Sequence, residues 1–162
     1  MEKINKKSRK VEVLLWSIAL PGFGQLLNRQ YVKGILLVGL EFIVNVMGRI
    51  NQVILLSFHG KIEAAIQQAD YLWLMFYPCL YFFAIWDAYK DAGGGQTPFA
   101  YLPFTMSAYV VTIGLIFSPL FTIFGYLLGP MWMFILFTPF GLCIGGVIRW
   151  FLFKRHGYVK YN

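Results

Sequence analysis

Charged side chains and cysteines are scarce in this sequence. Aspartate, glutamate, lysine and arginine make up 13% of the 162 residues, about half the share usual in a soluble domain. The two cysteines, Cys79 and Cys143, form no C-x-x-C pair, so we expect small buried side chains without a disulfide or a metal. The sequence has no Ser-His-Asp, H-E-x-x-H or phosphate-loop pattern. These absences argue against a soluble domain, a disulfide framework and the common catalytic motifs.

Apolar residues, by contrast, are abundant. They make up 59% of the chain, and the mean hydropathy is +0.63, which predicts a single-domain integral membrane protein. No cleavable signal peptide is expected, because the basic start Met1–Lys10 is followed by no A-x-A-like cleavage site. Five apolar segments are visible: Val13–Leu27, Ile35–Phe58, Tyr71–Trp86, Phe104–Leu128 and Met131–Phe153.

The first apolar segment is too short to cross a membrane. Val13–Leu20 makes about 12 Å of helix, whereas a span needs about 20 residues. Pro21 disfavours helix at the residue before it, and Gly22 and Gly24 permit a tight turn. We therefore expect a re-entrant hairpin over Val13–Gly34.

The distribution of lysine and arginine favours the hairpin over a fifth crossing. If the first segment spans, seven cations lie outside: Arg29, Lys33, Lys90, Arg149, Lys154, Arg155 and Lys160. If it turns back, only Lys61 lies outside and Arg49 sits in the outer half of the bilayer. The other twelve of the fourteen cations are then cytoplasmic. The positive-inside rule thus predicts both termini in the cytoplasm.

The predicted fold is an all-α integral membrane protein, with the re-entrant hairpin followed by four transmembrane helices. The helices are expected near residues 35–58, 68–90, 104–128 and 131–154. A basic cytoplasmic tail covers residues 1–10, and the hairpin and two helices cover 11–92. A linker follows at 93–103, and a C-terminal transmembrane hairpin with a basic tail covers 104–162.

Two stretches of the N-terminal half, PGFGQLLNRQYVKG and WDAYKDA, resemble a known family. They are similar to small bacterial membrane proteins related to the TM2 domain, and similar segments precede the permease core of some sugar ABC transporters. The matching residues are Pro21, Gly22, Gly24, Gln25, Tyr31, Lys33, Gly34, Trp86, Asp87, Ala88 and Tyr89. The resemblance covers Val11–Ala92 and implies an architecture and a bacterial plasma-membrane location.

Three polar residues are spaced four apart in the second apolar segment. Glu41, Asn45 and Arg49 would share one helix face, and a carboxylate at membrane depth is a functional candidate. They could line a path for a proton, ion or solute. Alternatively, and in our preferred interpretation, they form a structural stripe that packs the hairpin. In that case Gln25 or Asn28 should hydrogen-bond the Glu41 side chain.

Asp87 and Asp91 end the third apolar segment on its cytoplasmic side. They could bind a cation or a basic partner, but we expect a solvated helix end. Small residues four apart, at Gly114 and Ser118 and at Gly141 and Gly145, predict close packing of the last two helices, with an oligomer contact as the alternative.

The sequence favours a non-enzymatic accessory or scaffold subunit of a membrane complex, with a transporter as one candidate complex. The alternative is a small transport or channel subunit with a polar path lined by Glu41 and Asn45, and a membrane-bound enzyme is the least favoured class. No cofactor and no metal are expected. The net charge of +7 is assigned to anionic lipid headgroups rather than nucleic acid, and the expected protein partner is another membrane protein or a second copy.

Overall fold

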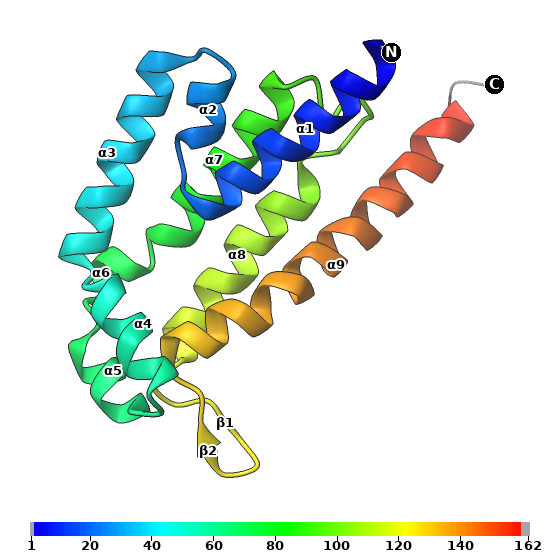
Figure 1. Ribbon diagram of the computed structural model, residues 1–162. Helices are drawn as coiled ribbons and strands as arrows, with labels where there is room; N and C mark the ends of the chain where they lie inside the picture. Colours follow the sequence, from blue (N-terminus) through cyan, green and yellow to red (C-terminus); the bar gives the residue numbers. More distant parts are fainter. Residues whose placement is uncertain (1, 160–162) are drawn as a thin grey trace.

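The computed structural model describes residues 2–159, with side chains described for residues 7–155. This part of the chain is mostly helical (Figure 1). The elements are α1 Glu2–Ala19, α2 Phe23–Leu27, α3 Tyr31–Met47, α4 Ile50–Phe58, α5 Ile62–Gln68, α6 Tyr71–Leu74, α7 Tyr77–Asp91, α8 Leu102–Phe117, β1 Thr122–Ile123, β2 Tyr126–Leu127 and α9 Gly129–Val159.

The chain turns back after α1, as the sequence predicts. Helix α1 ends at Ala19, and Gly22 adopts a left-handed conformation with φ 101°. A β-carbon there would lie 2.7 Å from the Gly34 carbonyl oxygen, so glycine is required both by its φ and by the space. The short helix α2 then leads to the end of the molecule where α3 begins (Figure 1).

The second predicted helix is broken. Residues 35–58 were expected to form one helix, but α3 and α4 are separate and bend by 61°. Arg49 sits between them in a left-handed conformation, with φ 53°. It therefore caps α4 and does not continue the face that carries Glu41.

The third and fourth predicted helices are shorter than expected. Instead of one helix over 68–90, a short α6 is followed by α7, which begins with Pro78 in its first turn. The helix expected over 104–128 ends at Phe117, and β1 and β2 then pair as an antiparallel hairpin. The prediction of a purely helical fold is wrong in this segment.

Helices α8 and α9 form a close antiparallel pair. A β-carbon on Gly141 would lie 2.5 Å from the Ser107 α-carbon, and one on Gly145 would lie 2.5 Å from the Leu102 carbonyl oxygen. Ser118 is buried, and its hydroxyl oxygen lies 3.1 Å from the Tyr71 hydroxyl oxygen, in a hydrogen bond that either group can donate. Gly114, Gly141 and Gly145 thus pack the last two helices together, as predicted, whereas Ser118 contacts α6.

Different helix ends and connections lie at the two ends of the molecule. The start of α1, the α2–α3 and α7–α8 connections and the end of α9 lie at one end (Figure 1). The α4–α5 pair and the β hairpin lie at the other. This arrangement brings together segments that are far apart in the sequence.

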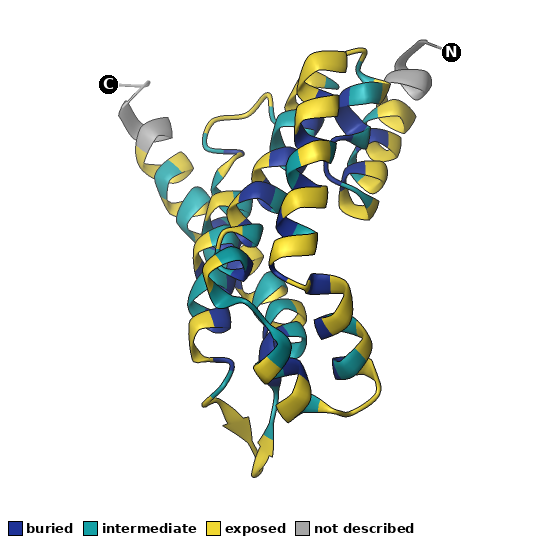
Figure 2. Ribbon diagram, turned by 90° about the vertical axis from the view of Figure 1, so that its left-hand side faces the viewer, coloured by how far each residue is buried: buried dark blue, intermediate teal, exposed yellow. Residues whose placement is uncertain are grey.

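The outer faces of the helices are apolar. Figure 2 shows exposed residues along the outside of the helices and buried ones between them. Large exposed apolar side chains include Val32, Ile35 and Phe42 on α3 and Phe140 and Trp150 on α9. Such continuous apolar surface is typical of a face that meets a membrane or a partner.

Within residues 2–159, one helix is long and apolar enough to cross a membrane by itself. It is the Gly129–Arg155 part of α9. Only 17% of the most apolar stretch of this helix is buried inside the protein. The bent pair α3–α4 meets the same condition if it is taken as one span. Cys79 and Cys143 are exposed, so the prediction that they are buried is wrong.

Candidate functional site

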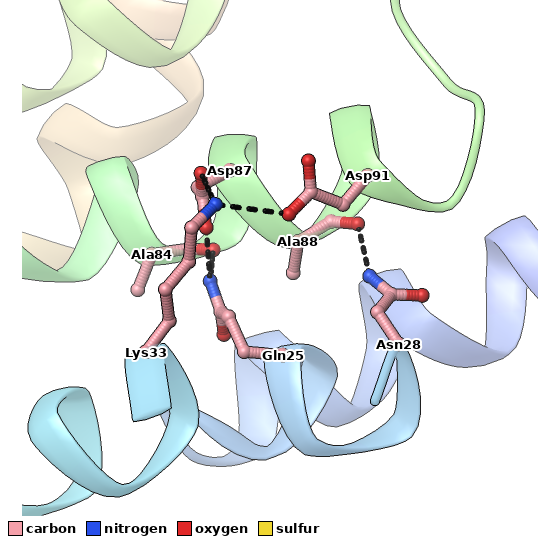
Figure 3. A network of polar contacts seen from close by, with 7 residues as sticks. All are labelled: Gln25, Asn28, Lys33, Ala84, Asp87, Ala88 and Asp91. Atoms are coloured by element: carbon pink, nitrogen blue, oxygen red, sulfur yellow. Dashed lines mark hydrogen bonds and ion pairs between the residues drawn. The ribbon is translucent and has the colours of Figure 1, made fainter. Parts of the chain in front are cut away.

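Polar side chains from α2 and the start of α3 converge on the C-terminal half of α7. Figure 3 shows Gln25, Asn28 and Lys33 directed at α7, where Asp87 and Asp91 meet Gln25 and Lys33 and the Ala88 carbonyl oxygen meets Asn28. The residues that bond to one another in this group lie 54 to 62 positions apart in the sequence. We call these five side chains the α2–α7 polar network.

Gln25 lies at the centre of the polar network. Its side chain is fully buried, and its Nε2 donates to the Ala84 carbonyl oxygen at 2.9 Å and to Asp87 Oδ2 at 3.1 Å. A helical carbonyl can accept a second hydrogen bond because its oxygen has two lone pairs. The amide oxygen of Gln25 has no hydrogen-bond partner among the described residues.

Lys33 links the two carboxylates of α7. Its Nζ lies 2.9 Å from Asp87 Oδ1 and 3.0 Å from Asp91 Oδ2. Lys33 precedes the apolar run that begins at Ile35, and its side chain donates hydrogen bonds to both carboxylates. Asp87 and Asp91 therefore bind a cation that this chain itself supplies, at the end of α7, where Asp91 is exposed.

Small residues let α2 approach α7 closely enough for these bonds. Ala84 and Ala88 are fully buried, and a β-carbon on Gly24 would lie 2.7 Å from the Ala88 β-carbon. Asn28 Nδ2 donates to the Ala88 carbonyl oxygen at 2.8 Å. Glycine at 24 and alanine at 88 thus set the distance that Gln25 and Asn28 must bridge.

Five of the eleven residues that carry the TM2-like pattern meet at this junction: Gly24, Gln25, Lys33, Asp87 and Ala88. Gly34 packs against Leu26, whose Cγ would lie 2.7 Å from an added β-carbon. Pro21 is buried in the turn, and Tyr89 packs beneath Gly94, at 2.5 Å from the position of an added β-carbon. The two halves of the pattern are therefore in contact, and its spacing has a structural reason.

Glu41 does not belong to the polar network. It is 7% exposed and forms a side-chain hydrogen bond with the Tyr77 hydroxyl. Gln25 and Asn28 bond instead to α7, so the prediction that one of them contacts Glu41 is wrong. The reason is the position along α7: Gln25 faces Ala84 and Asp87, which lie about two to three helical turns beyond Tyr77. Oε2 of Glu41 has no partner among the described residues.

Asn45 and Arg49 do not extend Glu41 into a buried stripe. Asn45 Nδ2 lies 3.3 Å from Asn51 Oδ1, across the bend between α3 and α4. Arg49 is exposed in the bend itself. The four-residue spacing predicted a common face, but the helix ends before Arg49.

Sequence reasoning missed the contribution of α7. Tyr77, Tyr81, Ala84 and Ala88 recur at helical spacing and face the hairpin and α3. The Tyr81 hydroxyl donates to the Ile18 carbonyl oxygen at 2.8 Å, tying α7 to the end of α1. This 3.6-residue periodicity was the signal available in the sequence.

The hydrogen-bond donors of the α2–α7 polar network bond to groups of this same chain. The network therefore has a structural role, which is to hold the hairpin against α7. Among residues 7–155, no group of three or more histidine, cysteine, aspartate or glutamate side chains could hold a metal ion. No family model, curated protein or solved structure matches the chain. The resemblance to TM2-related proteins stays a prediction.

Proposed function

We propose that this chain is a multi-pass protein of a bacterial plasma membrane that acts as a non-enzymatic accessory or scaffold subunit of a membrane complex, with a transporter complex as one candidate. The observation that carries the proposal is the α2–α7 polar network. It uses Gln25, Asn28 and Lys33 to hold a half-length hairpin on α7. A hairpin held in a fixed position, in a protein whose outer faces are apolar, fits a role in assembling a complex better than a role in catalysis.

The proposed membrane topology has four crossings and a re-entrant hairpin. The bent pair α3–α4, the α6–α7 segment, α8 and α9 are the crossings, and α1–α2 is the hairpin. In support, cations gather at the end that holds both termini: Lys7, Arg9, Lys10, Arg29, Lys33, Lys90, Arg149, Lys154 and Arg155. The positive-inside rule makes that end cytoplasmic, where anionic lipid headgroups attract it.

The test is co-purification after in-cell crosslinking. A tagged chain extracted in mild detergent should bring down one membrane protein, or a second copy of itself, in fixed stoichiometry. The Gln25→Leu variant should lose that partner because the hairpin is released, whereas Gln30→Leu, an exposed position nearby, should keep it. If the wild-type chain and the Gln30→Leu variant are both isolated without a partner in fixed stoichiometry, the scaffold function is contradicted.

One observation favours the alternative of a small transport or channel subunit. Glu41 is buried in α3 with one oxygen unpartnered among the described residues, and a carboxyl at that depth is a functional candidate. Flux through proteoliposomes that falls in Glu41→Gln but not in Asn51→Ala would support a path through Glu41. Equal flux in the wild type and in Glu41→Gln would contradict a path through Glu41.

A further inference from the structure

A cavity of about 180 Å³ lies beyond the turn of the N-terminal hairpin. Its walls come from the end of α1, from α4, from the α6–α7 segment, from α8 and from the start of α9. The cavity has a structural cause. The hairpin turns back partway along the bundle (Figure 1), so no helix fills the space beyond Ala19.

The cavity has a buried floor and an exposed mouth. Val53, Leu74 and Leu115 on the floor are 1–4% exposed. Ile18, which lies beside the hairpin turn, is 46% exposed. A molecule can therefore reach the floor from the outer surface of the bundle, beside the end of α1.

The chemistry of the walls excludes a polar ligand. Tyr77 and Tyr81 carry hydroxyls, but Tyr77 bonds to Glu41 and Tyr81 donates to the Ile18 carbonyl oxygen. A buried water needs two to four polar partners, and an apolar cavity of about 150 Å³ stays dry and binds small apolar molecules. The remaining named wall residues are aliphatic, aromatic or methionine side chains.

We propose that this cavity binds an acyl chain of a membrane lipid. The inference rests on the membrane placement proposed above, since the bilayer supplies the chain. With both termini in the cytoplasm, the cavity lies in the half of the bundle that faces the outer leaflet. The end of an acyl chain enters beside Ile18 and Ala19 and covers the apolar floor that the short hairpin leaves open.

The experiment uses the full chain in nanodiscs that contain a phospholipid with a diazirine near the end of one acyl chain. After irradiation, adducts are located by peptide sequencing in a mass spectrometer. We expect adducts on Ile54 and Met131 in the cavity to exceed those on Leu72, which is 81% exposed and faces outward. Adducts that are no more frequent at Ile54 and Met131 than at Leu72 would overturn the proposal.

Two substitutions test the site itself. Ala19→Phe closes the mouth and Ile54→Trp fills the interior, and each should lower the cavity adducts severalfold. The matched control is Ala64→Phe, at an exposed alanine on α5, which should change nothing. Unchanged adducts in both cavity variants, each checked for folding by its thermal melt, would overturn the proposal.

The outcome is separable from the fate of the proposed function. Thiol labelling of engineered cysteines tests the membrane placement independently. If that labelling agrees with four crossings and the cavity adducts are absent, the acyl-chain site alone is wrong. If the labelling contradicts four crossings, the assignment of the cavity to the outer leaflet is wrong, whereas an excess of adducts at Ile54 and Met131 over Leu72 would still support the acyl-chain site.

Discussion

At the scale of single residues, Gln25 is the side chain whose loss should cost most. It is fully buried and its amide serves both the Ala84 carbonyl oxygen and Asp87. In Gln25→Leu, the Asp87 carboxylate loses a donor inside the protein, and leaving such a group unsatisfied costs about 1–3 kcal/mol. A lower midpoint in a detergent melt should show it, with Gln30→Leu near wild type. Equal midpoints for both variants would contradict a structural role of Gln25.

The two aspartates should differ in their contribution. Asp87 bonds to both Lys33 and Gln25, whereas Asp91 bonds to Lys33. Asp87→Asn should therefore destabilise more than Asp91→Asn. Lys33 is half-exposed, so a double-mutant cycle between Lys33→Met and Asp91→Asn should give a coupling of about 0.2–1 kcal/mol.

Salt distinguishes this coupling from a packing effect. Because charges near the surface are screened, the Lys33–Asp91 coupling should shrink as the ionic strength of the melt buffer rises. The effect of Gln25→Leu should persist at high salt, since it concerns a buried hydrogen bond. A coupling that does not depend on salt would show that Lys33 acts through its aliphatic stem.

At the scale of elements, the contact of α2 with α7 depends on glycine. An added β-carbon at Gly24 would overlap the Ser17 hydroxyl and lie 2.7 Å from the Ala88 β-carbon. Gly24→Ala should destabilise by about 1–3 kcal/mol, as overpacking usually does. The matched control is Gly39→Ala on α3, where an added β-carbon would meet nothing within 4 Å.

The two glycine variants should move the melting midpoint in different ways. Gly39→Ala should leave it unchanged or raise it, because alanine favours helix over glycine. Gly24→Ala should lower it and weaken the α2–α7 polar network. A Gly24→Ala midpoint that equals the Gly39→Ala midpoint would mean that α2 can move away from α7 without loss.

At the scale of the whole molecule, the sidedness is open to a direct measurement. With Cys79 and Cys143 replaced by serine, single cysteines are placed at Glu63, Gln30 and Gln96. An impermeant thiol reagent added to intact cells should label Glu63→Cys, on the end that holds α5. Gln30→Cys and Gln96→Cys should be labelled only after the cells are opened, because their connections lie at the cation-rich end.

The control for this measurement is a permeant reagent, which should label all three cysteines. Labelling of Gln96→Cys from outside would mean that the α7–α8 connection lies on the outer side of the membrane. That result would support a fifth crossing. Lys160, which would report on the C-terminal end, lies outside the described residues.

The sequence by itself determined the features that depend on local chemistry and composition. Pro21 and Gly22 stop α1 because proline and glycine act on their own backbone and its immediate neighbours, so the turn could be predicted. The apolar content likewise required apolar outer faces on the helices. The small residues at Gly141 and Gly145 predicted a close helix pair because a missing side chain limits how near two backbones can come.

Only the tertiary structure decided which polar groups meet. Gln25 contacts Asp87 rather than Glu41 because the close approach of Gly24 to Ala88 fixes the rotation of α2 on α7. Glu41 contacts Tyr77 because α3 then faces the start of α7. The bend at Arg49 removed that residue from the face of Glu41, although the spacing suggested a stripe. Such pairings depend on the rotation and depth of packed helices, and spacing within one segment does not carry that information.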